Sequence, residues 1–73
     1  MKENVFVLLF SGRVVGVYTS HMKAMQTILL ETLRKGWTLA QYQYDFGVEF
    51  FSYEHDGVEE LYELQEVTPD NRA

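Results

Sequence analysis

The run Val5 to Phe10 constrains the fold more than any other stretch of the chain, because every one of its side chains is apolar. The run is too short to span a bilayer or to form the core of a signal peptide, but it suits a central strand. On a strand, Val5, Val7 and Leu9 would point to one face of a sheet, while Phe6, Leu8 and Phe10 would point to the other. A sheet built around this strand therefore needs cover on both faces.

A hairpin is predicted directly after this run. Ser11-Gly12 is typical of a tight turn, and the β-branched segment 13–19 would return as a second strand. Gly16 interrupts that strand and indicates a bulge or a close backbone contact.

The next segment predicts a helix from Ser20 to Lys35. Ser20 is a suitable N-cap, Arg34 and Lys35 would lie in the last turn, and Gly36 would end the helix. The spacing of three and four residues predicts one broad apolar face toward the core, formed by Met22, Ala24, Met25, Ile28, Leu29, Leu30 and Leu33.

Two ring-rich segments, 37–44 and 48–54, would form a second hairpin around Asp45-Phe46-Gly47. After the turn signal His55-Asp56-Gly57, segment 58–67 fits a last strand or a short helix, and we favour the strand. The predicted fold class is α+β: a single small domain with an antiparallel sheet of four to five strands (β-β-α-β-β-β) and one helix packed on one face. We expect the spatial order 2-1-3-4-5, a domain over 1–67 and a flexible tail over 68–73.

Length and composition narrow the class of protein. At 73 residues the chain is one small domain, and such a domain often gains stability from a partner. The absence of cysteine excludes disulfides, thiolate metal sites and a thiol nucleophile. We expect a cytoplasmic protein with no membrane segment.

Charge is distributed unevenly along the chain. Residues 36–71 contain no Lys or Arg, yet they hold nine carboxylates and eight of the eleven aromatic rings. The net charge is −5, although residues 1–35 alone carry +3. Because nucleic acid is bound by neutralising its phosphates with Lys and Arg, we expect no direct nucleic-acid binding, and a protein partner with a basic surface fits better. The plainer alternative is that these carboxylates keep a small protein soluble.

Catalytic and metal motifs are weak, and we expect neither enzyme activity nor a cofactor. His21 would lie in the first turn of the helix, where a structural or solvated role is more common than a catalytic one. Glu54-His55-Asp56 is the most metal-like cluster, but adjacent strand residues point to opposite faces, so a turn is the better interpretation.

The pattern Val5 to Phe10, then Gly16-Val17-Tyr18-Thr19-Ser20, then a helix carrying Ala24 resembles small uncharacterised bacterial and bacteriophage accessory proteins. The resemblance covers less than half of the chain and brings no catalytic residues. It implies a protein that binds and disables a host protein in the host cytoplasm, in some cases by presenting carboxylates where DNA phosphates would lie.

The sequence thus predicts a small acidic protein-binding module, a phage or mobile-element protein that inhibits a basic, nucleic-acid-handling host protein. The expected acidic contacts are Asp45, Glu49, Glu54, Asp56, Glu59, Glu60, Glu63 and Glu66. The expected aromatic contacts are Tyr42, Tyr44, Phe51, Tyr53 and Tyr62. The alternative is a self-associating structural or accessory protein, a homodimer formed through the uncovered sheet face.

Overall fold

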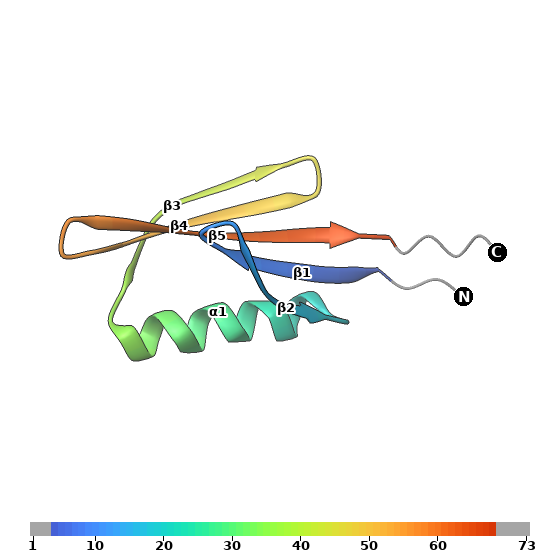
Figure 1. The fold of residues 1–73 in the computed structure, drawn as a ribbon, viewed down its shortest axis with the longest axis horizontal. Coiled ribbons are helices and arrows are strands. Elements are labelled where there is room, and N and C mark those ends of the chain that lie inside the picture. The colour runs from blue at the N-terminus through green and yellow to red at the C-terminus, as the bar shows by residue number, and fades with distance from the viewer. Residues whose placement is uncertain (1–3, 69–73) are drawn as a thin grey trace.

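In the computed structural model, which describes residues 4–68, five strands form one antiparallel sheet and one helix lies against it (Figure 1). The elements are β1 (Val5–Phe10), β2 (Arg13–Tyr18), α1 (His21–Lys35), β3 (Thr38–Asp45), β4 (Val48–His55) and β5 (Val58–Val67). The α+β class and the element order are confirmed, and 58–67 is a strand. Of the predicted tail 68–73, Thr68 is described and donates a hydrogen bond to Asn4 at 2.8 Å, whereas 69–73 lie outside the described residues.

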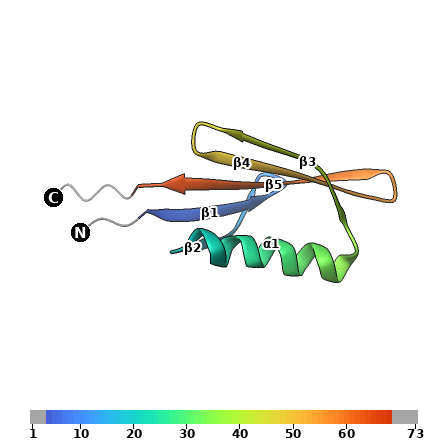
Figure 2. The same ribbon diagram turned by 180° about the vertical axis from the view of Figure 1, so that it is seen from behind.

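The strand order is β2-β1-β5-β4-β3, so the predicted order 2-1-3-4-5 is wrong. The last strand, β5, pairs with β1, and β3 takes the outer edge opposite β2 (Figure 2). The physical reason is burial: β5 supplies Tyr62 and Leu64 to the core, while every residue of β3 is exposed. The strand β5 has side chains to bury and takes a central position, whereas β3, whose residues are all exposed, takes the edge.

All three predicted turns are present, and they share one geometry. Ser11-Gly12, Phe46-Gly47 and Asp56-Gly57 each place two successive residues at positive φ. This is the type I′ turn, whose twist matches that of the flanking strands. Gly16 was expected to mark a bulge or a close backbone contact. The β1–β2 register shifts beside it, which is the bulge, and the Tyr18 ring lies so close that a Cβ at Gly16 would meet its hydroxyl at 2.8 Å.

The helix begins and ends as its sequence predicts. The backbone N–H of Lys23 donates to Ser20 Oγ at 3.0 Å, which caps the first turn. Gly36 adopts the left-handed conformation at φ 76°, and its N–H donates to the carbonyl of Leu33. The helix of the described residues is too short and too polar to cross a membrane.

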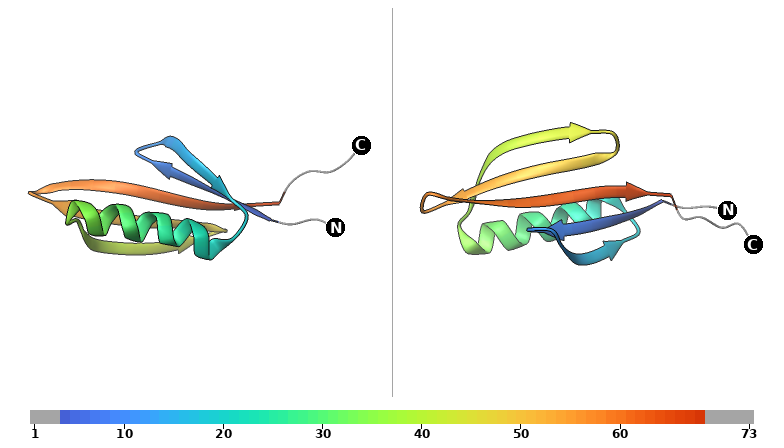
Figure 3. Two further views of the ribbon diagram at one scale, coloured as in Figure 1. Left: turned by 90° about the horizontal axis from the view of Figure 1, so that it is seen from below. Right: turned by 45° about the horizontal axis from the view of Figure 1, so that its top comes forward.

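The helix covers one face of the sheet, and no described element covers the other (Figure 3). Leu8 and Leu64 face each other on β1 and β5 and are buried with Ala24 and Ile28 of α1. The covered face is therefore the face of Phe6, Leu8 and Phe10. Val5, Val7 and Leu9 occupy the opposite face, as the alternation of a strand requires.

The single broad apolar face predicted for the helix is wrong, because the helix has two apolar faces. Ala24, Ile28 and Thr32 are buried against the sheet, and Met25 packs beside them. Four other large residues face away from the sheet, with exposed fractions of 69% for Met22, 54% for Leu29, 67% for Leu30 and 79% for Leu33. Spacing alone did not separate the two faces, because their residues interleave along the sequence.

This assignment can be tested with two truncations on neighbouring residues. Ile28→Ala should lower the free energy of unfolding by about 2 to 4 kcal/mol, because it leaves a cavity in the core. The matched control Leu29→Ala should change it by less than about 0.5 kcal/mol, because that side chain is already in water. Denaturant unfolding measures both, and equal losses would contradict the assignment.

Candidate functional site

The face of the sheet opposite α1, which we term the open face, is half apolar and half polar. Its apolar side chains lie on β1, β2, β4 and β5: Val5, Val7, Leu9, Val14, Val17, Val48, Phe50, Leu61 and Val67. Its polar side chains lie on β3, β4 and β5: Gln41, Gln43, Asp45, Ser52, Glu54, Glu59, Glu63 and Gln65. Apolar side chains interleaved with polar ones on an uncovered face are typical of an interface.

Two features of its carboxylates cost the free protein stability. Glu63 lies in a row across the sheet between Leu9 on β1 and Phe50 on β4, so a charge stands within the apolar area. Glu54 and Glu59 occupy directly opposed positions on β4 and β5. Like charges at opposed positions repel and destabilise a sheet. Both features would be relieved by cations from a partner.

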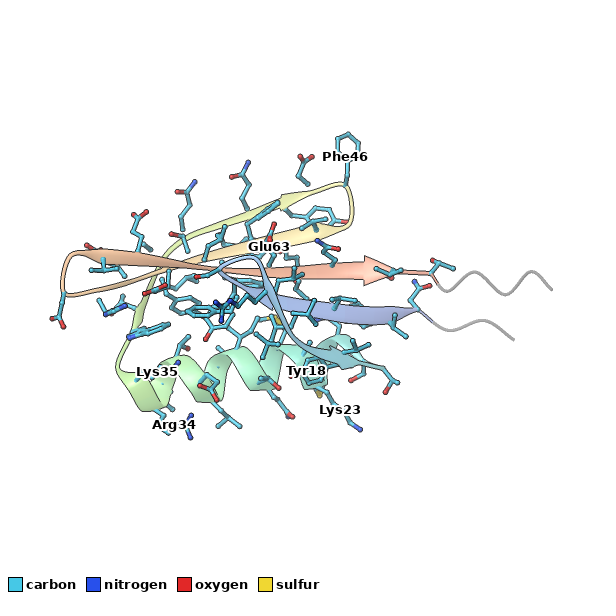
Figure 4. All side chains as sticks on the ribbon, viewed as in Figure 1. Tyr18, Lys23, Arg34, Lys35, Phe46 and Glu63 are labelled. Carbon is cyan, nitrogen blue, oxygen red and sulfur yellow. The ribbon has the colours of Figure 1, made fainter. Side chains whose placement is uncertain are left out.

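The described residues provide no Lys or Arg on the open face to neutralise these groups. Lys23, Arg34 and Lys35 lie on the helix, on the other side of the sheet (Figure 4). Arg13 is opposite Phe10, a residue of the covered face. The open face is therefore anionic, whereas the side that carries the helix has carboxylates and cations together, such as Glu31 beside Arg34 and Lys35.

A shallow hollow lies on the open face near β3. It has a volume of about 280 Å³ and is lined by Gln41, Gln43, Phe50, Ser52 and Leu61. Its lining combines one aromatic and one aliphatic side chain with two amides, a mixture suited to an inserted side chain of a partner.

The predicted acidic contacts do not form one surface. Asp45, Glu54, Glu59 and Glu63 share the open face, and Asp56 lies in the turn at its end. Glu49, Glu60 and Glu66 belong to the covered face, by their registers with Leu64, Tyr53 and Phe6. These three also have partners within the chain: His21 and Tyr42 for Glu49, His55 for Glu60 and Asn4 for Glu66.

The predicted aromatic contacts divide between the core and the edge of the sheet. Phe51, Tyr53 and Tyr62 are buried in the core, so we remove them from the candidate surface. Tyr42 and Tyr44 are exposed on β3, but on the side of the sheet that carries the helix. Loss of hydration and the nearby Glu49 carboxylate, which accepts a hydrogen bond from the phenol at 2.9 Å, raise the pKa of Tyr42.

Both histidines are held by a carboxylate and an aromatic ring. His21 Nε2 lies 2.9 Å from Glu49 Oε1, and its ring meets that of Phe6 edge-on. His55 Nε2 lies 3.2 Å from Glu60, and its ring stacks on Trp37 at 4.4 Å. Within residues 4–68, no group of three or more His, Cys, Asp or Glu is arranged to hold a metal ion.

The Trp37–His55 stack borders a polar cleft of about 530 Å³ at the end of the helix, lined in part by Lys35, Glu54 and Asp56. Lys35 Nζ lies 4.5 Å from the centre of the Trp37 ring, and Phe10 stacks on the same ring. These contacts join the C-terminal end of α1 to β1 and β4. They stabilise the crossover from the helix to β3.

Sequence reasoning missed Phe46, which is the most exposed large apolar residue described, at 95%. Its backbone is left-handed, at φ 49°, in a turn where asparagine or glycine is preferred. The ring projects from the β3–β4 turn, away from the helix (Figure 4). Asp45 and Val48, which flank this turn, belong to the open face. The signal in the sequence was a phenylalanine where a turn needs positive φ.

Comparison of the chain with protein-family models, with curated proteins and with solved structures found no match. Function is therefore inferred from the side chains of this chain and from their arrangement.

The turn geometry predicts that Phe46→Asn stabilises the protein by about 1 kcal/mol, because asparagine adopts the left-handed conformation with less strain. Ser11→Asn places the same residue at the equivalent position of another type I′ turn and is the matched control for backbone strain. Denaturant unfolding measures both effects. A loss of stability in Phe46→Asn would show that the ring packs in solution.

The burial of Tyr62 predicts that the protein loses stability at high pH. Burial, followed by the nearby Glu31, Tyr53 and Glu60, raises the pKa of Tyr62 above its ordinary value of 10.0. The phenol thus ionises more readily in the unfolded chain than in the folded protein. Its contribution to the free energy of unfolding is fully present below pH 10 and is lost as the pH rises through the folded-state pKa.

Tyr62→Phe should therefore lose less stability than the wild type when the pH is raised above 10, as measured by denaturant unfolding along a pH series. Tyr44→Phe, which removes an exposed phenol, is the control. Identical alkaline profiles for Tyr62→Phe and the wild type would contradict the assignment of Tyr62 to the core.

Proposed function

We propose that this protein is a binding module whose open face docks on a basic surface of another protein and blocks it. The observation that carries the proposal is the composition of the open face: apolar side chains, four carboxylates and no cation among the described residues. Apolar area provides affinity, and complementary charge provides orientation and a faster encounter.

The positions of the carboxylates specify what the partner has to supply. A lysine or arginine between Glu54 and Glu59 would convert a repulsive pair into an attractive one. A second cation, set among apolar side chains, would pair with Glu63 between Leu9 and Phe50. Pairs of this kind are stronger when the surrounding apolar contacts exclude water.

Phe46 completes the surface as an aromatic anchor. Exposed rings that enter a pocket of the partner commonly contribute a large share of binding energy. The strained position of Phe46 costs the free protein stability, so we propose that its ring acts in the complex.

The class of partner follows from its charge. Proteins that handle nucleic acid carry clustered Lys and Arg, because they neutralise phosphates. We propose such a protein as the target, with the open face covering the surface that nucleic acid would otherwise contact. The role of an inhibitor of a host protein is also the role that the sequence pattern of residues 5–24 leads us to expect.

Glu59→Lys separates binding from stability. We expect it to raise the free energy of unfolding by up to about 1 kcal/mol, because the introduced ammonium group would face the carboxylate of Glu54. The same change should reduce capture of a basic protein at least tenfold. Glu66→Lys, a change of equal charge on the covered side of the same strand, is the matched control for binding.

The measurement uses the wild type and both variants, each immobilised and exposed to a nuclease-treated bacterial lysate. A basic protein that is retained by the wild type and Glu66→Lys, released by moderate salt and lost with Glu59→Lys would support the proposal. The recovered protein should then lose its nucleic-acid binding when the wild type is added. Equal capture by all three proteins, or no effect on nucleic-acid binding, would contradict it.

A further inference from the structure

The outward face of α1 is a second apolar surface, and nothing within residues 4–68 covers it. Met22, Leu29 and Leu33 follow one another at spacings of seven and four residues, which places them in one line along a helix. Leu30 lies beside this line and borders a hollow of about 500 Å³ with Leu33 and Arg34. We term these four apolar residues the outer helix stripe.

Cations accompany the outer helix stripe. Lys23, Leu30 and Arg34 are spaced seven and four residues apart, so the two cations flank Leu30 on the same side of the helix. Arg34 donates to Glu31 at 3.0 Å, but its side chain is 72% exposed, and exposed pairs of this kind exchange partners at little cost. The stripe is thus apolar with cations at its side, whereas the open face is apolar with carboxylates.

We propose that the outer helix stripe of one copy docks on the open face of a second copy, so that the chain associates with itself head to tail. The inference rests on the open face as a binding surface, and it names the outer helix stripe of a second copy, with Lys23 and Arg34 at its side, as one surface that this face accepts. The sheet would then carry a helix on each face, which is a stable way to bury apolar side chains on both sides.

The dimensions of the two surfaces agree. A helix of 15 residues is about 22 Å long, which is shorter than the roughly 33 Å of the ten-residue strand β5. Lys23 and Arg34 are separated by about 16 Å along the helix axis, and Glu59 and Glu63 by about 14 Å along β5. One helix can therefore place a cation near each of these two carboxylates.

Symmetric alternatives bring like charges together. Two open faces would confront four carboxylates from each copy without a described cation between them. A contact between two outer helix stripes would bring Lys23 and Arg34 of both copies into one interface. The head-to-tail contact pairs opposite signs, and because it uses two different surfaces it forms a growing chain of copies or a closed ring.

Two variants and their mixture test the inference by analytical ultracentrifugation at low salt. The helix variant, Leu29→Glu with Leu33→Glu, changes exposed residues of the stripe. The sheet variant, Glu59→Lys with Glu63→Lys, changes the open face. We expect the wild type to form larger species as its concentration rises and to dissociate when salt is added. Each variant alone should be monomeric, and an equimolar mixture should form a 1:1 dimer, because each variant retains one intact surface.

A monomeric wild type at all concentrations would overturn the inference, as would a dimer that persists in either variant alone or a mixture that remains monomeric. Circular dichroism establishes that both variants are folded. The helix variant retains the open face, so it should still capture the basic protein from lysate. Loss of that capture would contradict the proposed function, while retained capture without self-association would contradict only the head-to-tail contact.

Discussion

The structure depends on one strand that is apolar on both sides. The covered-face residue Leu8 is buried in the core beneath the only described helix, whereas Val7 and Leu9 point to the face that nothing described covers. A chain of 73 residues with a single described helix supplies a second layer for one face of the sheet and leaves the other to water or to a partner. The same strand therefore creates the core and the candidate binding surface.

The described cations lie on the side of the helix because they lie in the first half of the sequence, and this leaves the open face anionic. Residues of the first half provide the helix and its cations, and residues of the second half provide β3, β4 and β5 with the carboxylates. Within the second half, the period of a strand divides the carboxylates again. Glu60 turns inward to His55, whereas Glu59 and Glu63 turn outward. The outward set has no described cation near it on the sheet, which makes a cationic partner the simplest way to stabilise it.

Local features of the fold were predictable because they depend on neighbouring residues. The turns with glycine at the second position, the cap at Ser20 and the left-handed Gly36 all follow from short-range geometry. Strand order was not predictable in this way, since either β3 or β5 could pair with β1. Only the burial of Tyr62 and Leu64 on β5 decides between these two orders.

The sequence predicted the charge of the candidate site but not which residues form it. The cation-free stretch indicated an anionic surface, yet its residues could be assigned to faces only with the strand register, which a bulge near Ala40 shifts on β3. The helix presented a similar difficulty, because Ile28 and Leu29 are equally apolar and only packing shows which of them faces the sheet.

The central claim is that the open face is a surface to be covered by a partner. Solvent paramagnetic broadening in nuclear magnetic resonance, recorded residue by residue in dilute and in concentrated protein, tests it most directly. We predict that Val17 and Leu61, which are 60% and 41% exposed, are strongly broadened in dilute solution and become protected on concentration together with Leu30, while Leu8 is protected throughout. Broadening of Val17 and Leu61 that is weak in dilute protein, or equally strong at every concentration, would contradict the account.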